Sequence, residues 1–297
     1  MENRFLDLAR TGQNAWWRYI LSLALILGSW LGGSVVLILL LIIIAPDLQV
    51  TPNGQILGVA TWLVLTITLA SFIPLVISLW LAVRFIHRRP FRSLITPQPH
   101  FDWKRAATGF VLFLILGGLA SVIEACLYPG RYQFSLNGNE FLVCLPIALV
   151  LVPIQTSAEE LFLRGYLLQS LGLVVRRPIV PVIVTSLIFM GLHGANPEMG
   201  AGTLIMLVYY FSVGLFLAVI TVRDNCLELA LGMHAATNLF GILVGYKESA
   251  LPIPSVFMVN TLDAGYGLIS FLVMAVIFYA VLFVRPHRPA QPLPNSP

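Results

Sequence analysis

The stretch ILSLALILGSWLGGSVVLILLLIIIA, residues 20–45, decides the class of this protein. It contains no charged residue, and serine and glycine are the only interruptions among its apolar side chains. About 20 consecutive apolar residues are enough for one helix to cross the hydrocarbon core of a bilayer. Residues 20–45 are therefore predicted to form a transmembrane helix.

The composition of the whole chain agrees with this prediction. Of its 297 residues, 58% are hydrophobic and only 10% are charged, and the mean hydropathy is +0.90. A soluble domain carries about 25% charged residues. The first apolar run is also longer than the core of a cleaved signal peptide, which has about 7–15 apolar residues. The three cysteines lack metal-binding spacing and lie in or beside apolar segments, which favours packing roles.

Apolar runs separated by prolines and polar residues predict an all-α membrane bundle of about eight spans. The predicted spans are residues 20–45, 56–83, 106–127, 141–170, 178–194, 202–222, 226–245 and 264–284. No internal repeat is visible in these segments. We divide the chain into an N-terminal membrane region (1–139, three spans), a core (140–245), a final span (246–284) and a Pro-rich tail (285–297) predicted to be disordered.

The basic residues predict how these spans are oriented. Lys and Arg concentrate on the cytoplasmic side of short membrane loops. With a cytoplasmic N-terminus, fourteen basic residues lie inside or at the inner boundary, and only Arg131 and Lys247 lie outside. Both termini are therefore predicted to be cytoplasmic. This asymmetry also explains the net charge of +4 without a nucleic-acid partner.

The fourth predicted span contains the sequence SAEELFLRGY, residues 157–166. A charged side chain at the centre of a bilayer costs about 2.5–3.5 kcal/mol on insertion scales, so such residues are usually paired or functional. Glu160 and Arg164 are four residues apart and can pair on one helix face. Glu159 is turned by about 100° from Glu160 and has no such partner. We expect Glu159 to find a partner on another helix, although all three residues could also form a purely structural ion-pair cluster.

Two further polar motifs lie in the fifth and seventh spans. They are FMGLH, which ends at His193, and HAATN, in which His234 and Asn238 share a helix face. Each alone could be a satisfied core histidine or a polar clamp between helices. At about 1.5 Å of rise per residue, however, all these groups lie roughly 12–22 Å from the cytoplasmic ends of their spans. A carboxylate and an imidazole in one layer can deprotonate water, and an imidazole and an amide can stabilise an oxyanion.

Together the three motifs resemble the family of CAAX proteases and bacteriocin-processing enzymes (the CPBP family), which includes the type II CAAX prenyl endopeptidases. The family pattern is Glu-Glu-x-x-x-Arg, then Phe-x-x-x-His, then His-x-x-x-Asn. This chain has these motifs at residues 159–164, 189–193 and 234–238, in the same order and with the same spacing. The resemblance covers roughly residues 140–245 and implies an intramembrane CAAX-type endopeptidase.

The resemblance also implies a role for each motif residue. Glu159 would be the general base, and His193 would help to position the water. His234 and Asn238 would stabilise the oxyanion. Structural support of the site would come from Glu160, Arg164 and Phe189.

The resemblance leaves the metal question open. The family contains enzymes described as metalloproteases, and Glu159, His193 and His234 could hold a divalent ion such as zinc. The sequence lacks the His-Glu-x-x-His zinc motif, so we expect no tightly bound zinc. The expected partners are membrane lipid and a peptide or protein substrate that arrives from the membrane or the cytoplasmic side, with no nucleic acid. The expected location is the plasma membrane of a prokaryote, as a multi-pass protein.

Two other functions compete with proteolysis. The same intramembrane charges could serve a proton- or ion-coupled transporter, although the clustering of polar groups in one layer argues against a path through the membrane. The chain could also be a non-enzymatic partner or immunity protein with the same fold, although the complete motif set argues against lost catalysis. Other intramembrane protease motifs fit less well, because Ser34 of a Gly-Gly-Ser sequence has no histidine partner in its span and no Gly-x-Gly-Asp sequence occurs.

Overall fold

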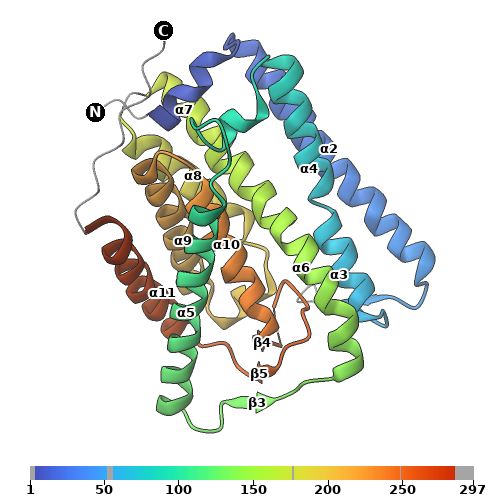
Figure 1. Cartoon of the computed structure of the whole chain (residues 1–297). Coiled ribbons are helices and arrows are strands. Elements are labelled where there is room, and N and C mark those ends of the chain that lie inside the picture. Colours follow the sequence, from blue (N-terminus) through green and yellow to red (C-terminus); the bar gives the residue numbers. More distant parts are fainter. Residues whose placement is uncertain (1–3, 52–55, 176, 248, 285–297) are drawn as a thin grey trace.

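The computed structural model describes residues 4–51, 56–175, 177–247 and 249–284, and its framework is a bundle of long apolar helices (Figure 1). Within these residues, six helical segments are long and apolar enough to cross a membrane. They are α2 (Trp16–Ile44), α3 to η2 (Thr61–Ile86), α5 (Trp103–Leu127), α6 to α7 (Gly138–Val174), α9 (Thr203–Asp224) and α11 to η7 (Ala264–Val284). The all-α, polytopic prediction is confirmed.

Several of these segments are made of shorter pieces. The second joins α3 (Thr61–Ala70), α4 (Ile73–Leu81) and the π-helix η2 (Ala82–Ile86), and the last joins α11 (Ala264–Tyr279) and η7 (Ala280–Val284). The fourth joins α6 (Gly138–Glu160), the π-helix η4 (Leu161–Leu168) and α7 (Gln169–Val174). The first polar motif therefore lies where α6 changes into a π-helix, a geometry that is common at functional sites. The remaining short helices are α1 (Arg4–Asp7), η1 (Leu8–Thr11), η3 (Phe91–Leu94) and η5 (Pro197–Ala201).

Two predicted spans correspond to short helices, α8 (Ile179–Leu192) and α10 (Glu228–Leu239). The 12 residues of α10 rise only about 18 Å, which is less than the thickness of a bilayer core of about 30 Å. The prediction of a span over 226–245 is wrong at its end, because a turn, η6 (Phe240–Ile242), and a strand, β4 (Val244–Tyr246), follow α10. The backbone of β4 pairs with another strand and so leaves the helix. The count of eight spans and the cytoplasmic termini stay predictions.

Short strands gather at the end of the bundle away from α1, which we call the distal end (Figure 1). There β3 (Tyr132–Phe134) pairs antiparallel with β5 (Phe257–Val259), and β4 pairs parallel with the other edge of β5. A second pair, β1 (Gln49–Val50) and β2 (Ile56–Leu57), is antiparallel. The three-stranded sheet joins chain segments that are more than 100 residues apart in sequence. It therefore fixes the distal connections relative to one another.

Helix α10 is central, with contacts to α5, α6 and α9. Two glycines bring its backbone close to α5. A Cβ on Gly232 would overlap the carbonyl oxygen of Ala106, and a Cβ on Gly109 would overlap that of Leu229. Small residues at such crossings let membrane helices approach closely. This contact sets the position of His234, which is two residues after Gly232.

Candidate functional site

Glu160 is the centre of a buried polar cluster. Its Oε1 accepts hydrogen bonds from Arg164 Nη1 at 2.7 Å and from His234 Nδ1 at 2.8 Å. Arg164 Nη2 donates to the carbonyl of Gly214 on α9 at 2.9 Å. The side chains of Glu160 and Arg164 are 0% exposed. The predicted pair of Glu160 and Arg164 is confirmed, and the histidine of the third motif joins it.

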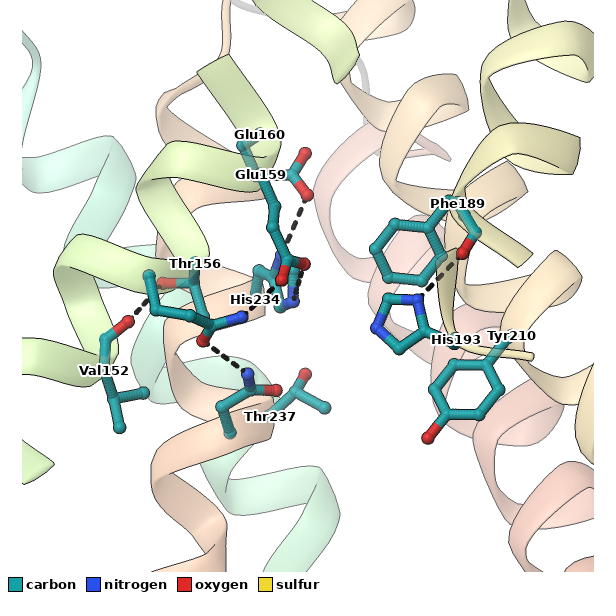
Figure 2. A network of polar contacts seen from close by, with 12 residues as sticks. Val152, Thr156, Glu159, Glu160, Phe189, His193, Tyr210, His234 and Thr237 are labelled. Carbon is teal, nitrogen blue, oxygen red and sulfur yellow. Dashed lines mark hydrogen bonds and ion pairs between the residues drawn. The ribbon is translucent and has the colours of Figure 1, made fainter. Parts of the chain in front are cut away.

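Glu159 lies beside this cluster but faces a cavity. Its Oε1 accepts a hydrogen bond of 2.5 Å from Gln155 Nε2, one turn earlier on α6. Its Oε2 lies 3.7 Å from His234 Nε2 on α10. The expected partner on another helix is thus His234, whose ring stands between the two glutamates (Figure 2).

Gln155 links two of the predicted residues and was not itself predicted. While its amide nitrogen donates to Glu159, its Oε1 accepts a hydrogen bond from Asn238 Nδ2 at 2.9 Å. Asn238 and Glu159, on α10 and α6, are therefore connected through one side chain. The signal in the sequence was a lone amide four residues before Glu159 in an apolar helix.

His193 stands across an open gap from Glu159 and His234 (Figure 2). It directly follows the last residue of α8, at the outer end of the predicted fifth span. Its Nδ1–H donates to the carbonyl of Phe189 at 2.8 Å, which leaves Nε2 as an acceptor. A carbonyl four residues earlier is a natural acceptor here because carbonyls in the last helical turn have no partner within the helix.

Aromatic rings hold the imidazole of His193. The ring of Phe189 lies 4.3 Å from it, and the ring of Tyr210 stacks on it at 4.4 Å with an interplanar angle of 26°. The Tyr210 hydroxyl accepts a hydrogen bond from Asn196 at 3.2 Å. Phe189 also lies under the guanidinium of Arg164 at 4.9 Å. Phe189 thus connects the buried cluster to His193, whereas Tyr210 and Asn196 are contacts that the sequence did not indicate.

These groups meet at a cavity of about 900 Å³. Glu159, His193 and Asn238 form part of its wall, together with Gln155 and Tyr210. The side chains of the buried cluster, including His234 at 4% exposure, lie behind this wall. At the polar site the wall therefore offers one carboxylate, one imidazole and the two amides of Gln155 and Asn238.

The described side chains do not form a metal centre. No group of three or more His, Cys, Asp or Glu residues within the described ranges is placed to hold an ion. In the candidate set of Glu159, His193 and His234, the ring of His193 stands on the opposite side of the gap from the other two side chains. This arrangement does not fit a three-ligand zinc site. We therefore derive no reaction step through a metal.

Comparison with known proteins points to one family. The family model described as "Type II CAAX prenyl endopeptidase Rce1-like" matches residues 138–240, which contain all three motifs. The chain is also 33% identical over 255 residues to "Uncharacterized protein YyaK" of Bacillus subtilis (strain 168), and the match covers 84% of this chain and 85% of that protein. No solved structure matches.

Proposed function

This chain belongs to the Rce1-like family of membrane proteins, which is a protease family, and from that premise we propose that it is an intramembrane endopeptidase in which Glu159 activates water. The observation that carries the proposal is the position of Glu159. Its carboxylate lies on the cavity wall, while Glu160 beside it is buried and used by Arg164 and His234. One glutamate is available for chemistry, and its neighbour holds the structure around it.

The proposed reaction needs one water and one peptide bond. Glu159 Oε2 is buried and accepts no hydrogen bond from the described residues, so it keeps a free lone pair for the proton of a water that enters beside it. His193 Nε2 is an acceptor on the other side of the gap and can hold the second water hydrogen. The water oxygen attacks the carbonyl carbon, and the proton on Glu159 then passes to the leaving amine as the C–N bond breaks.

Asn238 is the proposed donor to the oxyanion. Its Nδ2 uses one hydrogen on Gln155 and has a second hydrogen to offer the negative oxygen of the tetrahedral intermediate. His234 was expected to share this role. Because its ring is behind the wall, between Glu159 and Glu160, we propose that His234 acts mainly as a positioning residue, through its hydrogen bond to Glu160 beside Glu159.

The test is the substitution Glu159→Gln, with Glu140→Gln as its matched control. Both glutamates are on α6 and line the cavity, but only Glu159 is at the polar site. We expect Glu159→Gln to lower peptide cleavage by at least about 100-fold, since it removes the general base. Glu140→Gln should leave cleavage of uncharged peptides near the wild-type rate. Cleavage is measured by mass spectrometry of a peptide library incubated with the purified protein in detergent. Normal cleavage by a folded Glu159→Gln variant would refute the proposed base.

The family match extends the proposal to prenylated CAAX peptides, and the same assay can test this. The library includes each Cys-containing peptide with and without a farnesyl group. CAAX-type specificity predicts cleavage after the farnesylated cysteine only. If unmodified peptides are cleaved and this cleavage depends on Glu159, the proposed protease activity stands and the proposed CAAX specificity is refuted.

A further inference from the structure

The cavity reaches only one end of the bundle. Most of its exposed wall residues belong to the distal connections and strands, such as Leu57 in β2 at 49% exposure, and Leu192 at the end of α8 is 46% exposed. Among the described residues, none in the ranges 76–112, 164–191, 211–235 and 275–284 lines the cavity. These ranges form the half of the bundle near α1, which we call the proximal end (Figure 1). The cavity therefore opens at the distal end and stops at the polar site.

The proximal end is closed by packed side chains. Phe5 of α1 is 0% exposed, and α1 packs on α7. Beneath it, His87 Nε2 lies 2.9 Å from the Tyr166 hydroxyl, and Arg89 Nη1 donates to Gln169 Oε1 at 2.7 Å. These four side chains, His87, Arg89, Tyr166 and Gln169, form a layer that we call the proximal plug. The plug separates the polar site from the proximal surface.

The two ends differ in charge. The basic residues of the proximal end include Arg4, Arg10, Arg18, Arg84, Arg88, Arg89, Arg92, Lys104, Arg105 and Arg223. The distal end has Arg131 and Lys247 as its basic side chains within the described part of the chain. Because basic residues concentrate on the cytoplasmic side of short loops, the proximal end is the one predicted to be cytoplasmic. The mouth of the cavity then faces the opposite side of the membrane.

The wall also limits what the cavity can accept. Within the described residues, its charged side chains are five carboxylates and one ammonium group, namely Glu124, Glu140, Glu159, Glu198, Asp263 and Lys247. Arg131 pairs with two of these carboxylates, Glu124 and Asp263, at 3.4 Å each. The remaining negative charge would repel an acidic segment and favour a neutral or basic one.

We propose that the substrate is a peptide segment on the extracytoplasmic side, neutral or basic in charge, that enters through the distal mouth. The cleavage part of this proposal rests on the proposed function. The direction of access replaces the expectation of a substrate from the cytoplasmic side. It also predicts that prenylated C-termini on the cytoplasmic side, the substrates that the family match suggests, do not reach the site, because the proximal plug blocks that route.

Thiol labelling tests the direction of access without any need for activity. Cys126, Cys144 and Cys226 are first replaced by Ser. Thr237→Cys then places one thiol on the cavity wall, and His100→Cys places one on the proximal surface. Intact cells are treated with the membrane-impermeant cation 2-(trimethylammonium)ethyl methanethiosulfonate, and unreacted thiols are counted with a maleimide mass tag after solubilisation.

The proposal predicts that the external reagent modifies Thr237→Cys and reaches His100→Cys only after the cells are permeabilised. Ser121→Cys, on the α5 side of the same wall, repeats the measurement if Thr237→Cys does not fold. Modification of the cavity thiol only after permeabilisation would overturn the proposal. The labelling result does not depend on catalytic activity, since Thr237→Cys can be labelled equally in a Glu159→Gln background.

Sided vesicles test the substrate class. Impermeant peptides with basic, neutral or acidic side chains are added to right-side-out or inverted vesicles that contain the protein. We expect Glu159-dependent cleavage in right-side-out vesicles, with acidic peptides cleaved at least tenfold more slowly. Cleavage confined to inverted vesicles would refute the proposed direction of access but not the proposed protease activity. Absence of Glu159-dependent cleavage even in detergent would refute the proposed function, while labelling would still decide the direction.

Discussion

Replacing Gln155 by Leu would test whether the amide that links Glu159 to Asn238 is part of the catalytic arrangement. The substitution keeps a side chain of similar length and removes both hydrogen bonds, of 2.5 Å to Glu159 and 2.9 Å from Asn238. A hydrogen bond to a charged group contributes about 1.5–3 kcal/mol. If that free energy holds Glu159 in its reactive position, the activation barrier rises by the same amount. At about 1.4 kcal/mol per factor of ten, kcat falls about 10- to 150-fold.

The assay is steady-state cleavage of a fluorogenic peptide by the purified protein in detergent, with kcat and KM determined separately. We expect the loss in kcat with KM unchanged, because the interaction orients the base rather than the substrate. Thr156→Val is the matched control. Thr156 is also buried on α6, but its hydroxyl bonds only to carbonyls of the same helix, at 3.0 Å to Val152 and 3.3 Å to Pro153.

Two results would refute this reasoning. The first is a wild-type kcat in a Gln155→Leu variant with an unchanged melting temperature, since Glu159 would then not need the amide. The second is an equal loss of kcat in Thr156→Val, since a general weakening of α6 would explain both. A Gln155→Asn variant, whose amide is one methylene shorter, should lose nearly as much as Gln155→Leu if the contact depends on reach.

Three further predictions concern stability and are measured by thermal unfolding in detergent. Gly232→Ala should lower stability by about 1–3 kcal/mol, because its Cβ would overlap the α5 backbone, whereas Gly118→Ala, with nothing within 4 Å, should be neutral or stabilising. Asp263→Ala should cost about 1 kcal/mol through loss of the α11 cap. The hydrogen bond from Tyr266 N–H lowers the pKa of Asp263 below its ordinary 3.8, so wild type should lose this stability as pH falls below that value, and Asp263→Asn should not. Burial raises the pKa of Glu198 above its ordinary 4.5, so its carboxylate destabilises the fold increasingly as pH rises past 4.5, and the advantage of Glu198→Gln should be larger at pH 8 than at pH 4. An unstable Gly118→Ala, a pH-sensitive Asp263→Asn or a pH-independent effect of Glu198→Gln would each contradict its prediction.

The long helices could be predicted from the sequence because hydropathy alone determines which segments avoid water. The strands β3, β4 and β5 could not, since each has three residues and exists only through pairing with a distant segment. The end of α10 was missed for the same reason. Residues 240–245 are as apolar as the helix before them, and only the pairing of β4 with β5 shows that the helix has stopped.

The candidate site shows the same division between local and distant contacts. The pair of Glu160 and Arg164 followed from a spacing of four residues on one helix. The contact of His234 with both glutamates depends on how α10 packs between α5 and α6, which the close approach at Gly232 determines. Gln155 was missed because an amide in an apolar helix carries no motif. Its role depends on the simultaneous position of two other side chains.

The difference between the two neighbouring glutamates follows from these contacts. Glu160 is 0% exposed and accepts bonds from Arg164 and His234, so its negative charge is balanced by the guanidinium without any substrate. Glu159 has one amide donor and one imidazole at 3.7 Å, and its other side is the cavity. Removal of Glu160 would leave the buried charge of Arg164 unpaired, which costs about 3–5 kcal/mol and threatens the fold. Removal of Glu159 leaves that pair whole. Loss of activity with retained stability should therefore occur at Glu159 and not at Glu160, and this contrast separates the reactive carboxylate from the structural one.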